Sequence, residues 1–255
     1  MNGQTRRIVL PLLAFALCLA LWETASRVFA IPTYLMPSPS AILAAGHKLG
    51  WALASNAGAT LMTILLGFGL AIVIGIPLGV LVSCSPLVAE AFYPLIVFAH
   101  AIPIIAVAPV IVVIFGTDLL ARLIIVVLIA FFPIMVATAS GMLNTPRDML
   151  ELAQATAASR LVQITSIRIP HAIGYIFGGL RIGVTVAVVG TVVSEFVSSD
   201  RGLGYLVTAA TTQFNVPMAM ASVIVLASIS VVLYQLVGVA QRLLFPWSVA
   251  RSHVN

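Results

Sequence analysis

Six stretches of this 255-residue chain are long and apolar enough to cross a lipid bilayer as helices. A transmembrane helix needs about 20 consecutive residues that are mostly apolar. The stretches that meet this requirement cover about residues 8–28, 59–83, 92–115, 120–143, 174–198 and 217–245. We therefore predict an all-α, polytopic membrane protein, organised as one domain over residues 1–255.

Composition excludes most other classes of protein. Apolar residues make up 62% of the chain and charged residues only 7%, whereas soluble domains carry about 25% charged residues. The net charge is +5, but no basic run is longer than Arg6-Arg7, so we expect no nucleic-acid partner. Cys18 and Cys84 lie in apolar segments without partners at metal-ligand spacing, so we expect no metal site.

The distribution of charge predicts the orientation, since cytoplasmic loops of membrane proteins carry an excess of Lys and Arg. Segment 1–22 has the basic start and apolar core of a secretory signal, but no convincing cleavage site follows, so we favour an uncleaved first span. With the N-terminus inside, both termini and segment 145–170 are cytoplasmic. The cytoplasmic basic residues are then Arg6, Arg7, Arg147, Arg160, Arg168, Arg242 and Arg251, against Arg27, Lys48, Arg122 and Arg201 outside.

The external segment 31–57 contains a cluster of Pro and Ser that is typical of a turn. We expect Ser40 to cap a short helix that runs through Trp51.

Prolines punctuate the third and fourth predicted spans, at Pro94, Pro103, Pro109 and Pro133. Each removes a backbone donor and favours a kink. Irregular backbone at membrane depth is tolerated where protein or a water-filled cavity surrounds it. These spans are therefore candidates for lining a passage, although a structural kink explains any single proline equally well.

Small residues recur four positions apart in two predicted spans. Lipid supplies no hydrophobic drive between helices, so membrane helices associate by close backbone approach at small residues. Packing within the chain explains the spacing, and a seam between two copies is the alternative. The residues are Ala71, Gly75 and Gly79 in the second span, and Gly174, Gly178, Gly179 and Gly183 in the fifth.

A semi-polar segment, ELAQATAASRLVQITSIRIP (151–170), separates the fourth and fifth spans. The preceding TPRD (145–148) is typical of a helix start, with its threonine at the N-cap and its proline at the first helical position. We predict a helix over 147–156 and a second one from Ser159 that ends before Pro170, because the residue before a proline avoids the α region. A projecting hairpin of two short helices and an amphipathic loop on the membrane are the alternatives.

This segment resembles the cytoplasmic signature of the inner-membrane permeases of binding-protein-dependent (type I) ABC importers. That signature reads E-A-A, three residues, G, nine residues, I-x-L-P. The chain has Glu151-Leu152-Ala153, then Ala157 at the glycine position, and Ile167-Arg168-Ile169-Pro170 at the proper distance.

Further motifs are similar to the nitrate/sulfonate/taurine/bicarbonate branch of that family, and together they cover nearly all of residues 35–247. They are MPSPSAIL (36–43), GFGLAIVIGIPLGVL (67–81), HAIPIIAVAPVIVVIFG (100–116), FFPIMVATASGM (131–142), GGLRIGVTVAVVGTVVSEF (178–196) and GLGYL (202–206).

The resemblance implies the rest of a transport system in the bacterial inner membrane. A second permease copy pairs with this one as a homodimer, two ABC ATPase subunits sit beneath them, and a periplasmic or lipid-anchored solute-binding protein delivers the solute. ATP and magnesium are bound by the ATPases, so this chain binds no cofactor. ATPase closure drives alternating access through a coupling helix that begins near Asp148.

The coupling residues that the resemblance implies are Asp148, Leu150, Glu151, Ala153, Gln154, Ala157, Arg160, Ile167 and Pro170. Ala157 departs from the family pattern, because glycine normally permits the turn between the two short helices. We expect Ala157 to make that turn within ordinary φ/ψ limits.

Candidates for the translocation pathway lie mainly on the fifth span. Glu195 is a candidate because an ionisable group at membrane depth costs about 2.5–3.5 kcal/mol on insertion scales. Arg181 either contacts a subunit or snorkels toward the headgroups, and His100 is either a structural histidine or a proton relay. Asp118 and Arg122 are expected to form a surface ion pair. The full pathway set is His100, Pro103, Arg181, Thr185, Thr191, Ser194 and Glu195.

Two other classes of function are weighed against this interpretation. A membrane enzyme needs clustered carboxylates, a metal set or a Ser/His arrangement, but the four histidines are scattered and G-x-S-x-G is absent. No P-loop surrounds the single lysine, Lys48, so ATP hydrolysis requires another subunit. An ion-coupled secondary transporter remains the alternative, and it would need midplane ionisable residues or inverted repeats. The solutes implied are small oxyanions, sulfonates and aromatic or pyrimidine-type compounds.

Overall fold

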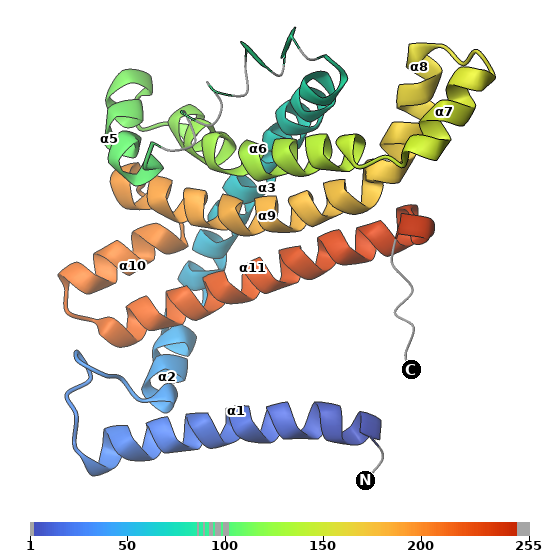
Figure 1. The fold of residues 1–255 in the computed structure, drawn as a ribbon. Helices are drawn as coiled ribbons and strands as arrows, with labels where there is room; N and C mark the ends of the chain where they lie inside the picture. Colours follow the sequence, from blue (N-terminus) through green and yellow to red (C-terminus); the bar gives the residue numbers. More distant parts are fainter. Residues whose placement is uncertain are drawn as a thin grey trace. The chain divides into compact units, whose positions relative to one another are not determined.

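The computed structural model describes residues 3–85, 87, 88, 90, 91, 94, 98 and 102–248. Within these residues all regular secondary structure is helical (Figure 1). The prediction of an all-α protein with several apolar spans is confirmed. The segments long and apolar enough to span a membrane are Val9–Val28, Trp51–Cys84, Leu119–Leu143, Arg160–Ser198 and Val216–Leu244. They belong to helices α1 (Gly3–Val28), α3 (Trp51–Cys84), α6 (Leu119–Leu143), α9 (Ile169–Ser198) and α11 (Val216–Leu244).

The predicted third span, residues 92–115, is represented by the shorter helix α5 (Ile104–Phe115). Its 12 residues extend about 18 Å at 1.5 Å per residue. The hydrocarbon core of a bilayer is about 30 Å thick, so α5 alone does not cross it. Most of residues 92–101, including His100, lie outside the described residues.

Residues 1–59 and 201–226 form one compact unit. It contains α1, α2 (Pro39–Leu49), the first turns of α3, α10 (Leu203–Thr212) and the start of α11. The Asn56 side chain of α3 accepts a 2.6 Å hydrogen bond from the Gly202 N–H, just before α10. Gly202 has a φ of +116°, a value that glycine adopts readily because it lacks a Cβ.

The predicted cap of α2 is wrong by two residues. Ser38, not Ser40, is the N-cap, and its hydroxyl accepts the Ala41 N–H at 3.3 Å. Ser40 instead donates its hydroxyl to Glu23 of α1 at 2.7 Å, and its backbone N–H reaches the other carboxylate oxygen at 3.0 Å. Arg27 completes the link with a 2.6 Å bond to Glu23.

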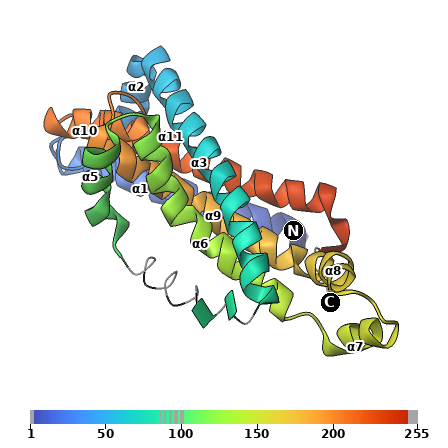
Figure 2. The same cartoon turned by 90° about the horizontal axis from the view of Figure 1, so that it is seen from above.

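Residues 60–200 and 227–255 form the second unit, whose centre is the pair α6 and α9. The two helices lie side by side in both ribbon views, with α5 at one end (Figures 1 and 2). Ile125, Val126 and Ile134 of α6 are completely buried, and a Cβ on Gly183 or Gly190 of α9 would lie within 3.0 Å of an α6 side chain.

Glycines allow the close approach of these helices. A Cβ on Gly75 or Gly79 of α3 would lie within 2.9 Å of a backbone oxygen of α6, and a Cβ on Gly179 of α9 would lie 2.5 Å from Ala137. A Cβ on Gly183 of α9 would likewise lie 2.8 Å from Ile134 of α6, so packing within the chain uses these predicted small residues. Gly178 differs, because its Cβ would meet no atom within 4 Å.

Two local predictions around segment 145–170 are wrong. Thr145 does not cap the next helix, since its hydroxyl donates to the Met142 carbonyl at 2.9 Å and Pro146 occupies the N-cap position. The helix also does not stop before Pro170, because Ile169 keeps helical angles of −63° and −50°. A π-helical turn, η1 (Ile164–Arg168), precedes the proline, and the Ile169 N–H bonds the Ile164 carbonyl. This wider turn changes the hydrogen-bond register just before a residue that lacks an N–H.

Candidate functional site

Two short helices, α7 (Arg147–Ala155) and α8 (Arg160–Gln163), form a hairpin beyond one end of α6 and α9 (Figures 1 and 2). The predicted cap of α8 is confirmed, because the Ser159 hydroxyl accepts the Val162 N–H at 3.4 Å. The helix α8 continues through η1 into α9, so the hairpin is joined to a membrane span without an intervening loop.

The turn of the hairpin is a Schellman motif with Ala157 at its left-handed position. Ala157 has a φ of +52°, and its N–H bonds the Gln154 carbonyl at 2.9 Å. The Ala158 N–H bonds the Ala153 carbonyl at 2.8 Å. These are the two hydrogen bonds of that motif, which normally ends in glycine. The expectation that Ala157 keeps ordinary backbone angles is wrong, and the family's preference for glycine at this position has a physical reason.

Most of the predicted coupling residues are accessible on the hairpin. Only Ala153 is buried, at 5% exposure. Leu150, Ile167 and Pro170 are half-buried, and the exposed residues are Asp148, Glu151, Gln154, Ala157 and Arg160.

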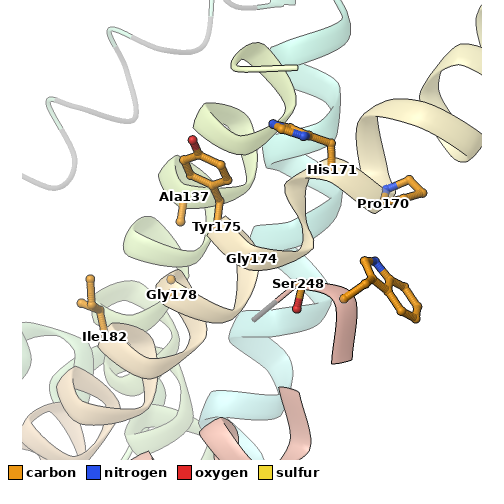
Figure 3. A pocket seen from close by; sticks show the side chains of 10 residues that line it. Ala137, Pro170, His171, Gly174, Tyr175, Gly178, Ile182 and Ser248 are labelled. Atoms are coloured by element: carbon orange, nitrogen blue, oxygen red, sulfur yellow. The ribbon is translucent and has the colours of Figure 1, made fainter. Parts of the chain in front are cut away.

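An apolar hollow of about 450 Å³ lies beside α7. Met149 and Leu152 of α7 form one side, and Trp247 of the C-terminal turn η2 (Pro246–Ser248) contributes to the lining. Leu152 and Trp247 are 68% and 65% exposed. A second hollow of about 680 Å³ shares Pro170, His171 and Trp247 and continues along α9 past Gly174 and Gly178 (Figure 3). Large apolar side chains therefore stay uncovered where the hairpin meets η2.

The predicted pathway residues on α9 divide into buried and exposed groups. Thr191 and Ser194 are fully buried and donate their hydroxyls to backbone carbonyls of their own helix. Glu195 is 1% exposed and accepts a 2.8 Å hydrogen bond from Thr60 of α3. Thr185 is exposed, and its hydroxyl bonds the Arg181 carbonyl at 3.0 Å.

Two further predictions concern Pro103 and the pair Asp118 and Arg122, which lie outside α9. Pro103 is the N-cap residue of α5 and helps to line an apolar hollow of about 280 Å³. Arg122 is buried at 6% exposure, and its Nη1 donates to Ser199 at 3.3 Å. The expected surface ion pair of Arg122 with Asp118 is therefore wrong.

Arg181 is half-buried, and among the residues that the structure describes it forms no ion pair with a carboxylate. Its Nη2 donates to the Gln241 side-chain oxygen of α11 at 2.9 Å, and its Cζ lies 5.7 Å from the centre of the Tyr234 ring. These partners were missed by the sequence reasoning. The available signal was the spacing of Tyr234, Gly238 and Gln241, which places them on one face of an otherwise apolar span.

A protein-family model described as "Binding-protein-dependent transport system inner membrane component" matches residues 71–248. The chain belongs to this family. The predicted resemblance to permeases of binding-protein-dependent ABC importers is thereby confirmed. The family's fold and the apolar helices identify a multi-pass inner-membrane permease.

Related permeases match over most of their length. A probable ABC transporter permease of Haemophilus influenzae is 35% identical over 231 residues, which cover 89% of this chain and 93% of the relative. The formylaminopyrimidine transport permease ThiX of Halalkalibacterium halodurans is 34% identical, with 93% and 95% covered. The taurine transport permease TauC of Escherichia coli is 28% identical, with 95% and 91% covered. Relatives thus include the branch that the motifs resembled.

A solved structure has the same fold. A chain of the methionine ABC transporter MetNI, in an inward-facing form, superposes with a TM-score of 0.67. The match covers 79% of this permease and 98% of that chain, at 19% identity.

Proposed function

We propose that this permease forms the translocation pathway of an ATP-driven importer, and that ABC ATPase subunits dock on the α7–α8 hairpin. The observation that carries this proposal is the hairpin's direct helical continuity with α9. A separate ATPase subunit can move a membrane helix only by binding an exposed element that is rigidly joined to that helix. The chain itself then acts as a transport subunit, and ATP hydrolysis takes place in the ATPases.

The proposed architecture is one permease domain over residues 1–255 with six spans. The third of these spans is the expected segment 92–115, of which the structure describes α5. Both termini and the hairpin are cytoplasmic, following the excess of basic residues on that side. In this proposal two copies pair around the pathway. An external solute-binding protein delivers the solute, a step that the family's description as binding-protein-dependent supports.

Within the hairpin, we assign the contact with the ATPase to the exposed side of α7. Asp148, Glu151 and Gln154 are spaced three residues apart and are all exposed, so they share one side of the helix. Leu150, Ile167 and Pro170 are half-buried, and Arg160 is the first residue of α8. Buried Ala153 holds α7 against the rest of the hairpin.

Along the pathway, we assign direct contact with solute to exposed Thr185. Thr191, Ser194 and Glu195 do not touch the solute but hold α9 in place beside the pathway, because their side chains are buried within the permease. His100 and Pro103 complete the pathway from the proline-rich segment before and at the start of α5. The solute is a small sulfonate, an oxyanion or a related organic compound, since relatives are named for taurine, aliphatic sulfonates and formylaminopyrimidine.

The test is a charge reversal on the hairpin, Glu151→Lys, with Asp200→Lys as the matched control. Both carboxylates are exposed, but Asp200 follows the end of α9 that lies away from the hairpin. We expect Glu151→Lys to insert in the membrane yet lose co-purification of the ATPase, while Asp200→Lys keeps it. Retained attachment and ATP hydrolysis in Glu151→Lys would reject docking at this helix. Uptake driven by an ion gradient in vesicles without the ATPase would reject the importer altogether.

A further inference from the structure

The inner ends of α9 and α11 meet along a continuous seam. On α9, Gly174, Phe177 and Arg181 are spaced three and four residues apart and so share one face. A Cβ on Gly174 would lie 3.3 Å from the Ser248 carbonyl oxygen, and the Phe177 and Phe245 rings lie 5.6 Å apart. Figure 3 shows Ser248 beside the Gly174 turn of α9. The C-terminal turn is therefore held directly against the first turns of α9.

Arg181 is the polar centre of this seam. Its guanidinium lies over Tyr234, donates to Gln241 and fits against Gly238, where an added Cβ would lie 3.0 Å from Nη2. Within the part of the chain that the structure describes, no carboxylate lies within ion-pair distance of Arg181. An arginine within a span is costly, and here a neutral amide and an aromatic face offset that cost.

The polar contact extends from Gln241 to the C-terminal turn. Gln241 is 7% exposed, and its Nε2 donates to the Ser248 hydroxyl at 3.2 Å. Ser248 in turn donates to the Phe245 carbonyl at 2.8 Å. Trp247 packs edge-on against Phe245, with ring centres 5.4 Å apart. Arg181 thus fixes, through Gln241, the turn that carries Trp247 beside the hairpin.

A free arginine that only snorkels would have a different environment. Snorkelling places the charged end in water and leaves the aliphatic stem on apolar surface. The Nε of Arg181 is instead fully buried and lacks a hydrogen-bond partner in the structure. The side chain is ordered by α11 itself, so its contacts belong to the joint between two helices.

We propose that Arg181 is a positioning residue that makes α9 and α11 move as one body when the hairpin is displaced; this inference rests on the proposed function. The hairpin is continuous with α9 through η1, so its displacement arrives first at the turns that hold Gly174 and Arg181. The Arg181 contacts pass that displacement to α11 and η2. Without them, α9 moves while α11 lags, and ATP hydrolysis becomes uncoupled from the change of access.

The experiment measures the α9–α11 distance in the reconstituted complex with its ATPase, using ATP and vanadate as the trapping probe. Spin labels replace Val189 of α9 and Val232 of α11, which are 53% and 55% exposed, in a background where Cys18 and Cys84 are serine. We expect one narrow distance that stays unchanged on trapping. In Arg181→Met we expect a broadened distance that shifts on trapping. A wild-type pair that shifts, or an Arg181→Met pair that stays narrow, would overturn the proposal.

We call the contacts of Arg181 with α11 the clamp. Two matched control variants separate loss of the clamp from a general loss of stability in the permease. Arg242→Met removes an exposed arginine on the same helix end without touching the partners of Arg181, so the distance should stay narrow. Gly238→Ala should broaden the distance in the same direction but less than Arg181→Met, because its methyl group would lie 3.0 Å from Nη2 and shift the guanidinium by a few tenths of an ångström. Gly178→Ala should not, because its methyl group would meet no atom within 4 Å. A defect in both glycine variants, or in neither, would count against the clamp.

A spectroscopic readout follows Trp247 directly. With Trp22 and Trp51 replaced by phenylalanine, Trp247 is the remaining fluorophore among three tryptophans. We expect Arg181→Met to raise quenching of its emission by acrylamide, and Arg181→Lys to restore part of the protection by donating to Gln241. Unchanged quenching in Arg181→Met would show that Arg181 does not position the turn. If the ATPase fails to bind even the wild-type permease, the proposed function fails; if it binds and only these readouts fail, the clamp alone is wrong.

Discussion

The Thr60 hydroxyl of α3 donates a 2.8 Å hydrogen bond to the Glu195 carboxyl group of α9, and both side chains are 1% exposed or less. The two residues are 135 positions apart in the chain. A carboxyl group inside a membrane bundle is tolerated when polar partners replace its lost hydration. This bond therefore fixes the C-terminal part of α9 against α3.

Replacing Thr60 by valine should destabilise the permease, because valine has the same shape but leaves a buried acceptor without this donor. Removing one partner of a buried hydrogen bond costs about 1–3 kcal/mol, so we expect a loss of about 2 kcal/mol. Thermal unfolding in detergent should show a lower midpoint for Thr60→Val and a nearly unchanged midpoint for Thr60→Ser, which keeps the hydroxyl. Equal midpoints for the two variants would contradict the importance of the bond.

Gly79 and Gly69 offer a second matched pair on α3. A Cβ on Gly79 would lie 2.6 Å from the Met135 carbonyl oxygen of α6, whereas a Cβ on Gly69 would meet no atom within 4 Å. Backbone gives way less readily than a flexible side chain, so Gly79→Ala should cost about 1–3 kcal/mol by overpacking. Gly69→Ala should be neutral or stabilise by up to about 1 kcal/mol through helix propensity. The midpoints of thermal unfolding measure both, and a larger loss in Gly69→Ala would contradict this packing of α3 on α6.

The start of α2 is tested by removing one serine hydroxyl at a time. Ser38→Ala should cost about 1 kcal/mol, the usual contribution of an N-cap, and should speed hydrogen exchange at the Ala41 amide. Ser40→Ala should leave that amide protected while loosening the link to Glu23 and Arg27. Unchanged exchange at the Ala41 amide in Ser38→Ala would contradict the cap at Ser38.

Hydropathy and length predict the spans well because they depend on local sequence. The expected segments 8–28, 120–143 and 217–245 agree within one residue with the apolar spans Val9–Val28, Leu119–Leu143 and Val216–Leu244. The same holds for the cap at Ser159, whose hydroxyl bonds an amide only three residues away. The family motifs also predict where the hairpin lies, because the spacing of their residues is a property of the local sequence.

Contacts between residues that are far apart in the chain could not be predicted from hydropathy or local motifs. Nothing near Glu195 in the sequence indicates Thr60 as its partner, and Arg181 finds Gln241 only because α9 and α11 pack together. The same limit applies to Ser40, which lies near a plausible helix start but is engaged by Glu23 of α1. The π-helical turn before Pro170 is likewise decided by how α8 and α9 are joined, since proline alone predicts a break.

The last prediction concerns Ala157, whose positive φ is strained for any residue with a Cβ. A left-handed conformation costs about 1–2 kcal/mol for such a residue. Glycine removes that strain but loses about 0.4–1 kcal/mol through the greater freedom of the unfolded chain. We therefore expect Ala157→Gly to stabilise the hairpin by about 0.5–1 kcal/mol, the net of those two effects. Hydrogen exchange at the Ala158 amide, which bonds the Ala153 carbonyl, reports this change as slower exchange.

Ala155→Gly is the matched control for that measurement, because Ala155 is the last residue of α7 and keeps helical angles. Glycine there should weaken α7 by about 0.8–1 kcal/mol, so exchange at the Ala158 amide should become faster. The two alanine-to-glycine changes, only two residues apart, are thus expected to act in opposite directions. Faster exchange in Ala157→Gly would contradict the left-handed turn, and relief of backbone strain could then no longer explain the family's glycine at this position.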